Sequence, residues 1–217
     1  MTDFATRRVM MVDTQVRPSD VTKFPIIEAM LHVPREVYVP RHLREAAYMG
    51  ENLPLSAGRV VLEPRTLAKM LDALDIHPTE TVLDLGCGLG YSTAVIARLA
   101  DAVVAVEADD SLASDAQSTL SSESVDNAAV IVGPLAEGAA KHGPYDVITV
   151  QGGVEIIPQA LLDQLKDGGR IAAIFMEGQL GSVRIGYKRD GRLDWRFAFN
   201  ASAPVVAGFA KERAFAL

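Results

Sequence analysis

A glycine-rich loop followed by an acidic residue is the stretch of this sequence whose residue types and spacing best fit a chemical role. The loop reads Gly86-Cys87-Gly88-Leu89-Gly90, with glycine at every second position. Such a backbone can turn sharply and lie against a ligand where a Cβ atom would collide. Glu107 follows 17 residues after Gly90, and its two carboxylate oxygens can accept hydrogen bonds from two adjacent ribose hydroxyls. The pattern therefore predicts a nucleoside site.

The spacing of the glycines separates two kinds of cofactor. A dinucleotide fingerprint, G-x-G-x-x-G, would place its third glycine where Tyr91 stands. The stretch from Asp84 to Gly90 instead resembles the first motif of S-adenosylmethionine-dependent methyltransferases, in which the loop faces a methionine and a ribose rather than a diphosphate. We interpret it as an S-adenosyl-L-methionine site; a dinucleotide site and a purely structural glycine turn are the alternatives.

The elements around the loop predict a parallel sheet. Residues 82–85 form a short apolar run with one acid, as expected of a buried strand. A helix at 92–99 and a strand at 102–106 should follow. The same alternation predicts further strands at 128–132, 145–150 and 170–175 and further helices at 111–120 and 157–165. Repeated strand and helix units of this length indicate an α/β, Rossmann-like fold with helices on both faces, which binds ligands at the carboxyl ends of its strands.

About 80 residues precede the first of these strands, and they predict an N-terminal helical cap. We expect helices at 3–16, 21–31 and 41–48, loop or edge structure at 49–63, and an amphipathic helix opened by Pro64. Near the other end, Asp190-Gly191 suits a hairpin turn between strands 183–188 and 193–199. We expect one domain, 1–217, with the cap and substrate region at 1–79 and the cofactor-binding core at 80–217.

The composition argues against several other functions. The net charge is −7, without a long run of Lys or Arg, so nucleic acid is disfavoured as the main partner. No apolar stretch approaches the roughly 20 residues that span a bilayer, and Met1-Thr2-Asp3-Phe4 lacks a signal-peptide pattern. We therefore expect a cytoplasmic protein with no membrane partner. The four histidines are scattered, which predicts no metal site.

Cys87 is the single cysteine of the chain, which rules out an internal disulfide and suits a reducing compartment. Its place inside the glycine loop raises the question of a nucleophile. No histidine is spaced to form a recognisable Cys/His pair with it. We interpret Cys87 as a small side chain that fills a tight turn.

Two further stretches resemble a particular family. Residues 33–40 read Val-Pro-Arg-Glu-Val-Tyr-Val-Pro, and residues 157–170 read Ile-Pro-Gln-Ala-Leu-Leu-Asp-Gln-Leu-Lys-Asp-Gly-Gly-Arg. Together with Ala47-Tyr48 and Leu53-Pro54-Leu55 they are similar to protein-L-isoaspartate O-methyltransferases, over roughly residues 8–175. The resemblance implies a class I methyltransferase with a mostly parallel seven-stranded sheet. It also implies transfer of the sulfonium methyl to the carboxylate of L-isoaspartyl residues in damaged proteins, a repair reaction that proceeds through a succinimide.

The resemblance also implies which positions form the site. Cofactor contacts are expected from Asp84, Gly86, Cys87, Gly88, Gly90, Tyr91, Glu107, Ala108, Pro134, Leu135 and Gln151. Substrate contacts are expected from Val60, Glu63 and Gly152, and Leu62 stands at the position of the family's serine, the one candidate catalytic position. The expected partners are isoaspartyl-containing proteins or peptides.

The substrate motif departs from the family's pattern. Where the family carries Gln-Thr-Ile-Ser-Gln-Pro, residues 59–64 read Arg-Val-Val-Leu-Glu-Pro. The threonine falls on Val60 and the serine on Leu62, so hydroxyls that could bind the isoaspartyl carboxylate are replaced by apolar groups. Glu63 would repel that carboxylate if it faced the pocket, or stabilise the helix opened by Pro64 if it capped it. We favour the cap.

Other departures lie near the cofactor and the substrate. Gly50 stands for the family's Asp after Ala-Tyr, and Pro134 for the Asp after Gly133. The proline removes an acid and an N–H near the expected adenine or its ribose, which predicts reduced cofactor affinity. The late segment Ala203-Pro204-Val205-Val206 lacks the hydroxyl of the family's Val-Pro-Leu-Thr-like segment.

Three functions fit these residues. The first is isoaspartyl methylation. The second is a methyltransferase of the same family that acts on another, more apolar acceptor, which Val60 and Leu62 would favour. The third is a non-catalytic protein that binds S-adenosylmethionine. Nucleic-acid methylation is disfavoured, because Gln151-Gly152-Gly153 stands where an Asn/Asp-Pro-Pro-Tyr-type loop would be expected. No heptad repeat indicates an oligomeric state.

Overall fold

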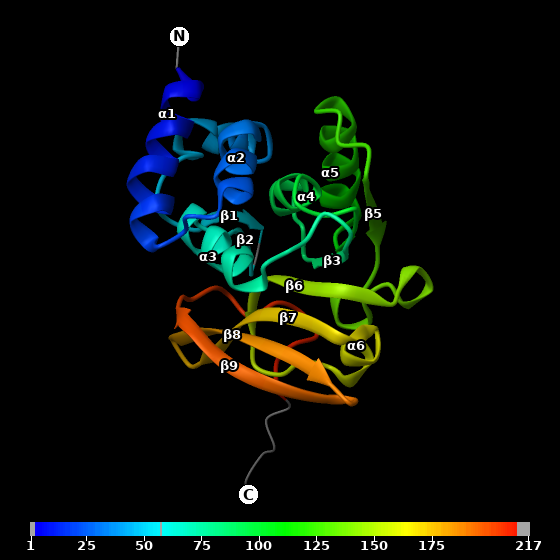
Figure 1. The fold of residues 1–217 in the computed structure, drawn as a ribbon. Helices are drawn as coiled ribbons and strands as arrows, with labels where there is room; N and C mark the ends of the chain where they lie inside the picture. Colours follow the sequence, from blue (N-terminus) through cyan, green and yellow to red (C-terminus); the bar gives the residue numbers. More distant parts are fainter. Residues whose placement is uncertain (1–2, 57, 212–217) are drawn as a thin grey trace, which may run out of the picture.

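The computed structural model describes residues 3–56 and 58–211, and a sheet of seven strands runs through this part of the chain (Figure 1). The strands follow the order β5-β4-β3-β6-β7-β8-β9. Their bounds are β3 Thr81–Leu85, β4 Ala102–Glu107, β5 Ala128–Val132, β6 Tyr145–Val154, β7 Leu165–Glu177, β8 Leu180–Arg189 and β9 Arg192–Asn200. The strands from β3 to β7 pair in parallel, and β8 and β9 are antiparallel. The predicted mostly parallel, Rossmann-like sheet is confirmed.

Helices cover both faces of the sheet. Their bounds are α1 Phe4–Met11, α2 Phe24–His32, α3 Pro64–Leu74, α4 Tyr91–Ala97, α5 Asp110–Ser122 and α6 Gln159–Asp163. Neighbouring residues of β3 point to opposite faces, so Val82 joins one buried apolar cluster and Leu83 joins a second. The first cluster packs α1 to α4 on the sheet, and the second packs α6 and Phe209 on the other face. In Figure 1 α2 stands beside α4, and α1 and α2 lie away from the β8–β9 hairpin.

Local signals explain where several helices begin. The Asp3 side chain accepts a hydrogen bond from the Thr6 N–H at the start of α1, and the Asp109 side chain accepts from two N–H groups at the start of α5. Proline occupies the first turn of α2 and of α3, where its missing N–H costs least. The helix predicted at 3–16 is α1 followed without a break by a π-helical turn, Val12–Val16.

The segment 49–63 forms a small antiparallel sheet of its own, β1 Leu53–Ser56 and β2 Arg59–Val61. This hairpin lies against the glycine loop, because a Cβ atom on Gly88 would be 2.4 Å from Leu55 Cδ1. The buried Arg35 fixes the end of the hairpin. Its Nε donates to the Ala47 carbonyl at 2.7 Å and its Nη2 to the Leu62 carbonyl at 2.8 Å. The Val-Pro-Arg-Glu stretch is thereby tied to Leu62, the residue that follows β2.

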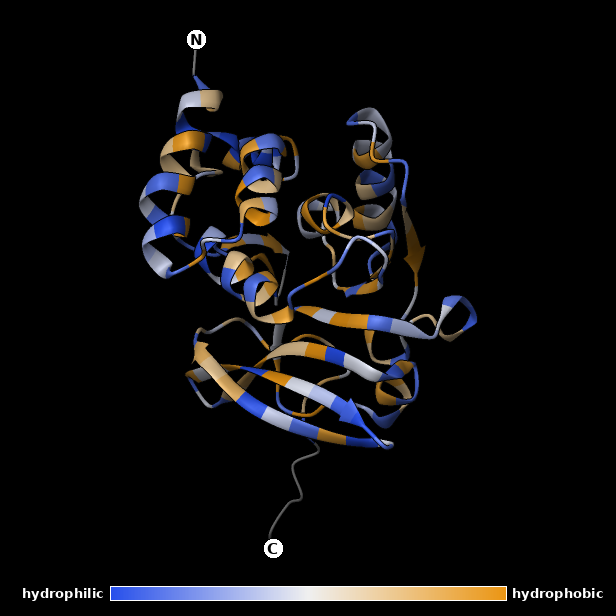
Figure 2. Ribbon diagram, in the orientation of Figure 1, coloured by the Kyte–Doolittle hydropathy of each residue, from blue (hydrophilic) through white to orange (hydrophobic). Residues whose placement is uncertain are grey.

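The C-terminal hairpin confirms the turn predicted from the sequence. Asp190 and Gly191 have φ values of +50° and +72°, as a two-residue hairpin turn requires. Polar and apolar residues alternate along β9 (Figure 2), and Trp195 packs edge-on against Phe175 at 4.7 Å between ring centroids. Within the described residues no helix is long and apolar enough to cross a membrane.

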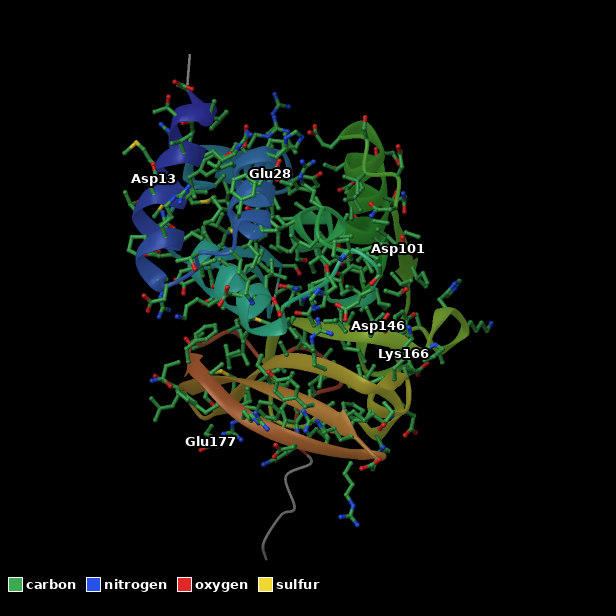
Figure 3. All side chains as sticks on the ribbon, viewed as in Figure 1. Asp13, Glu28, Asp101, Asp146, Lys166 and Glu177 are labelled. Carbon is green, nitrogen blue, oxygen red and sulfur yellow. The ribbon has the colours of Figure 1, made fainter. Side chains whose placement is uncertain are left out.

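The amino ends of the parallel strands are tied by ion pairs. Lys166 lies beside Asp146 in Figure 3, with Nζ 2.8 Å from the carboxylate oxygens. Arg170 forms two hydrogen bonds with Glu80, at 2.6 and 2.7 Å. Both pairs hold the edge of the sheet opposite to the glycine loop, and so leave the carboxyl ends of the strands for the site.

Candidate functional site

The glycine loop joins the end of β3 to the start of α4. The Gly86 N–H donates to the Val106 carbonyl at 2.8 Å, and the Gly90 N–H donates to the Cys87 carbonyl at 2.9 Å. The three glycines have φ values of +80°, +58° and +96°. Side chains other than glycine rarely adopt this region, which explains the glycine at every second position.

Asp84 lies beneath the loop and is fully buried. Its carboxylate accepts hydrogen bonds from Ser92 Oγ at 2.7 Å, Thr93 Oγ1 at 2.7 Å and Gln151 Nε2 at 2.8 Å. Burial raises the pKa of Asp84, and the three donors act in the opposite direction. The residue joins β3, α4 and β6, so it positions the loop from below.

Glu107 ends β4 and is fully buried beside the loop. Its carboxylate accepts hydrogen bonds from the N–H groups of Gly88 at 2.8 Å, Ala108 at 2.8 Å and Asp109 at 3.2 Å. These bonds turn the carboxylate toward the glycine loop, where the sequence predicts a ribose.

Arg59 of β2 binds the same carboxylate. Arg59 Nη1 lies 2.5 Å from Glu107 Oε1 and Nη2 lies 2.7 Å from Oε2. Nη2 is also 3.1 Å from the position that a Cβ atom on Gly86 would take. The Arg59 guanidinium therefore contacts both the glycine loop and Glu107, the acid for which the sequence predicts cofactor binding.

The space between the loop and β2 is small in this arrangement. A cavity of about 10 Å³ is lined by Val60, Val61, Leu62, Leu67, Gly86, Cys87, Tyr91, Ser92 and Gln151. Small-molecule sites have volumes of roughly 300–1,000 Å³. The glycine loop and the strand-end acid fit a nucleoside cofactor in residue type and position, and in this arrangement the Arg59 guanidinium binds the acid.

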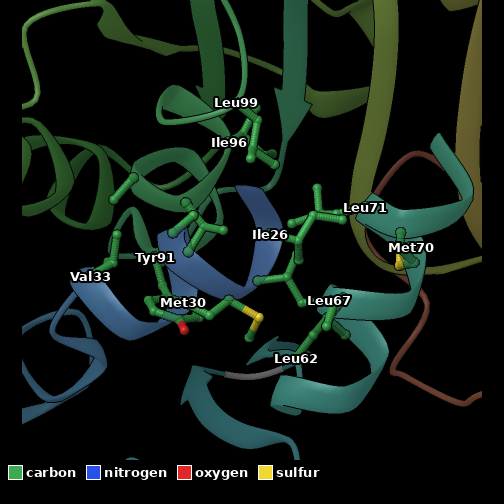
Figure 4. Close-up of a cluster of buried hydrophobic side chains, with 14 of the residues drawn as sticks. Ile26, Met30, Val33, Leu62, Leu67, Met70, Leu71, Tyr91, Ile96 and Leu99 are labelled. Atoms are coloured by element: carbon green, nitrogen blue, oxygen red, sulfur yellow. The ribbon is translucent and has the colours of Figure 1, made fainter. Parts of the chain in front are cut away.

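The residues expected on the substrate side divide into two groups. Val60 and Leu62 line the cavity, although Leu62 is only 3% exposed and lies among Met30 and Leu67 in the apolar cluster of Figure 4. Glu63 stands at the N-cap position of α3, where it accepts from Thr66 Oγ1 at 2.6 Å and pairs with Arg65 at 3.7 Å. The Glu63 side chain makes no capping hydrogen bond to a backbone N–H of α3, and it does not line the cavity beside the glycine loop, so its contacts are with the Thr66 and Arg65 side chains.

Of three other expected positions, two lie beside the glycine loop and one does not. The Gly133 N–H donates to the Glu107 carbonyl at 3.0 Å, which brings Pro134 next to the end of β4. Leu135 is buried, with Cδ1 3.4 Å from the Cβ position of Gly86. Gly152 faces the late segment instead, since a Cβ atom there would be 2.4 Å from Val206 Cγ1.

The environment of Cys87 does not suit a nucleophile. Burial raises the pKa of the Cys87 thiol, and the carboxylates of Asp84 and Glu107 raise it further. The thiolate, which is the reactive form, is therefore scarce at neutral pH. Among the described residues, no cluster of His, Cys, Asp and Glu side chains could hold a metal ion.

The site contains residues that the sequence reasoning did not single out. Ser92 and Thr93 bind Asp84, and Arg59 binds Glu107. One signal for Arg59 was available, because a basic residue stands directly before the apolar run Val60 to Leu62, at a position for which the resemblance implies glutamine. The sequence does not show that Arg59 pairs with Glu107, because only the fold brings these two residues together.

A mostly parallel sheet with a glycine loop after β3 and a buried acid at the end of β4 fits the class of Rossmann-like, S-adenosylmethionine-dependent methyltransferases. The family model described as Protein-L-isoaspartate(D-aspartate) O-methyltransferase (PCMT) matches residues 8–192. The chain belongs to this family.

Individual relatives agree with the family match. A protein-L-isoaspartate O-methyltransferase of Koribacter versatilis is 35% identical over 193 residues, covering 89% of this chain and 87% of the relative. One of Syntrophus aciditrophicus is 39% identical over 171 residues, covering 79% of this chain and 78% of the relative. The sequence resemblance is thereby confirmed.

Solved structures share the fold. A protein-L-isoaspartate O-methyltransferase aligns with a TM-score of 0.81 at 23% identity, covering 93% of this chain and 66% of that chain. A Plasmodium falciparum protein described as a β-aspartate methyltransferase, in complex with S-adenosyl-L-homocysteine, aligns with a TM-score of 0.78 at 18% identity, covering 94% of this chain and 98% of that chain.

Proposed function

We propose that this protein is an S-adenosylmethionine-dependent O-methyltransferase that methylates the carboxylate of L-isoaspartyl residues in damaged proteins. The observation that carries the proposal is the family match over residues 8–192 on a chain that keeps both the glycine loop and the buried Glu107. The backbone nitrogen then attacks the methyl ester and expels methanol to form a succinimide, and water opens this ring in part to normal aspartate, so the reaction repairs protein. The single cysteine suits a reducing, cytoplasmic setting.

The protein contributes to this reaction mainly by positioning the cofactor and the acceptor carboxylate. The cofactor, when bound, supplies an electrophilic methyl group on its sulfonium. The acceptor carboxylate is already ionised near neutral pH, so no general base is needed. Holding the reacting groups in line can contribute roughly 7–11 kcal/mol. In this chain the backbone of the glycine loop, supported by Asp84, and the carboxylate of Glu107 would bind and orient the nucleoside.

We assign the remaining roles by position. The main chain at Gly86 and Gly88, the N–H of Ala108 and the loop at Pro134 and Leu135 border the proposed nucleoside site. Val60 and Leu62, on the opposite wall of the cavity, would cover the reacting groups and exclude water. We propose that residues 1–79 carry the substrate region and residues 80–217 the cofactor-binding core.

A second acceptor is favoured by one specific observation. Leu62, at the position of the family's serine, is 3% exposed and packs in the apolar cluster. It offers no hydroxyl to an acceptor carboxylate, and Val60 beside it offers none either. A methyltransferase with the same cofactor and a more apolar acceptor is therefore the alternative function.

A methyl-transfer assay distinguishes the two. Purified protein is incubated with methyl-labelled S-adenosylmethionine and a peptide containing one isoaspartyl residue, and a peptide of the same sequence with normal aspartate serves as the control. We expect base-labile label on the isoaspartyl peptide alone. Cofactor binding by calorimetry without label on either peptide would reject the repair function in favour of another acceptor.

A further inference from the structure

The Arg59–Glu107 pair has the geometry of a strong charge-assisted interaction. Arg59 Nη1 donates to Glu107 Oε1 at 2.5 Å and Arg59 Nη2 donates to Oε2 at 2.7 Å. The side chains of Arg59 and Glu107 are 11% and 0% exposed. A bidentate arginine–carboxylate pair is among the strongest hydrogen-bonded ion pairs, and burial protects it from screening by salt.

The pair also uses up the acceptor capacity of Glu107. A carboxylate offers about four lone-pair sites. The N–H groups of Gly88, Ala108 and Asp109 and the two Arg59 nitrogens form five hydrogen bonds with it. Two of these five bonds come from Arg59, so two ribose hydroxyls could take their place on the carboxylate only after Arg59 has left.

Arg59 is anchored differently from Arg170, which also forms a two-bond pair with a glutamate. Arg170 binds Glu80 through the same two-bond geometry, but its Nε also donates to the Leu74 carbonyl. The Arg59 Nε is buried and has no hydrogen-bond partner among the described residues. Arg170 is thus fixed to the main chain of its surroundings, whereas Arg59 is held through Glu107.

We propose that Arg59 is a built-in competitor of the cofactor. Its guanidinium binds Glu107 when the nucleoside is absent and leaves when the ribose hydroxyls bind, so the identity of residue 59 sets the cofactor affinity of this enzyme. The inference rests on the cofactor assignment of the proposed function and is independent of which acceptor is methylated.

The size of the effect follows from populations. The apparent dissociation constant equals the intrinsic one divided by the fraction of protein that is competent to bind. If Arg59 occupies Glu107 in about 90–99% of the free molecules, removal of the guanidinium tightens binding about 10- to 100-fold.

The test compares Arg59→Gln with the wild type by calorimetric titration with S-adenosylhomocysteine, which requires no turnover. Glutamine is the residue that the family resemblance of the sequence implies for this position. Arg170→Gln is the matched control, since it breaks a two-bond arginine–glutamate pair of the same geometry at the amino ends of the strands, away from the glycine loop. We expect about 10- to 100-fold tighter binding by Arg59→Gln and binding by Arg170→Gln within about twofold of the wild type.

Arg59→Lys supplies a second variant that keeps the cation but loses the planar fork. Its affinity should lie between those of the wild type and Arg59→Gln. Circular dichroism and thermal unfolding establish that each variant is folded before it is titrated. If Arg59→Gln failed to fold, Arg59→Lys alone would still have to bind more tightly than the wild type.

The outcomes separate this inference from the proposed function. Equal or weaker binding by Arg59→Gln overturns it, and so does failure of both proteins to bind, because the site would then be closed for another reason. Tighter binding by Arg59→Gln without methyl transfer to the isoaspartyl peptide supports the inference and rejects the repair function. If the wild type methylates the isoaspartyl peptide but binds the cofactor product as tightly as Arg59→Gln does, the repair function is supported and the inference about Arg59 is rejected.

Discussion

Gln151 donates a hydrogen bond to Asp84 across the paired ends of β6 and β3, with Nε2 2.8 Å from Oδ1. Both residues are buried, at 4% and 0% exposure. Because the other oxygen of Asp84 accepts from α4 through Ser92 and Thr93, this one carboxylate joins the three elements that meet under the glycine loop.

Replacing Asp84 should therefore affect both stability and the loop. Asp84→Ala leaves two hydroxyls without an acceptor and leaves Gln151 Nε2 with only its 3.4 Å bond to Thr149 Oγ1, and we expect it to lower the free energy of unfolding by roughly 3 kcal/mol. Asp84→Asn should cost less, since its amide oxygen can accept from Ser92 and Thr93 while Gln151 turns its own oxygen toward the new NH₂ group. Urea unfolding measures both, and equal losses in the two variants would contradict this account.

The Glu80–Arg170 pair predicts a pH dependence of stability. Burial alone would raise the pKa of Glu80, but hydrogen bonds from Arg170 and from the His77 N–H outweigh it and lower that pKa below its ordinary value. A lowered folded-state pKa means that the pair stabilises the protein above the unfolded-state pKa, about 4.3. This contribution is lost as the pH falls through the lower, folded-state pKa.

Arg170→Gln removes that contribution. We expect it to lower the free energy of unfolding by roughly 2–3 kcal/mol at pH 7, and the difference from the wild type should shrink as the pH falls below about 4. Urea unfolding at a series of pH values gives the result. A difference that stays constant between pH 7 and pH 3 would show that the ion pair is not its cause.

The contact between the hairpin and the loop can be tested at Gly88. Gly88→Ala places a Cβ atom 2.4 Å from Leu55 Cδ1 and puts alanine at a φ of +58°. We expect a loss of roughly 2–4 kcal/mol from strain and overpacking together. Gly168→Ala isolates the backbone effect, because Gly168 has a φ of +83° with nothing within 4 Å of its Cβ position.

The double variant Gly88→Ala, Leu55→Ala completes this test. Removing the Leu55 side chain should abolish the steric part, so that Gly88→Ala costs about as much in the Leu55→Ala background as Gly168→Ala costs in the wild type, roughly 1–2 kcal/mol. Additive losses from Leu55→Ala and Gly88→Ala would place the two residues out of contact.

Much of the fold follows from local patterns. The strand at Ala128–Val132 has the bounds that the apolar run predicts, Pro64 begins α3, and Asp190-Gly191 forms the turn. Each of these signals acts within a few residues, through a fixed φ, a missing N–H or a continuous buried run. The glycine loop could be predicted in the same way, because its three positive φ values occur at its three glycines, the residues that adopt such values without strain.

Other features depend on partners that are distant in the sequence. The helix expected at 157–165 is the shorter α6, Gln159–Asp163, since Leu165 already pairs with Tyr145 as part of the sheet. The segment 49–63 gave no clear period, and its hairpin is held by Arg35 and by packing on the loop. Arg59 meets Glu107 across 48 residues. Composition and spacing do not specify such a pair.

Arg35 supplies the last prediction, because it holds the hairpin from within the core. Its guanidinium is fully buried, lies 4.5 Å from the centre of the Tyr91 ring and donates to the carbonyls of Ala47 and Leu62. Arg35→Met keeps an apolar chain of similar length but leaves both carbonyls without a donor. We expect a loss of roughly 3 kcal/mol in the free energy of unfolding.

Arg196 provides the control for Arg35. It also lies over an aromatic ring, 5.2 Å from the centre of Tyr187, and it pairs with Asp194 at 3.3 Å, but its side chain is 64% exposed. Arg196→Met should change the free energy of unfolding by less than about 1 kcal/mol, because exposed pairs are weakened by water and salt. Urea unfolding of the two variants side by side measures the difference, and similar losses would mean that burial of Arg35 adds nothing to its role.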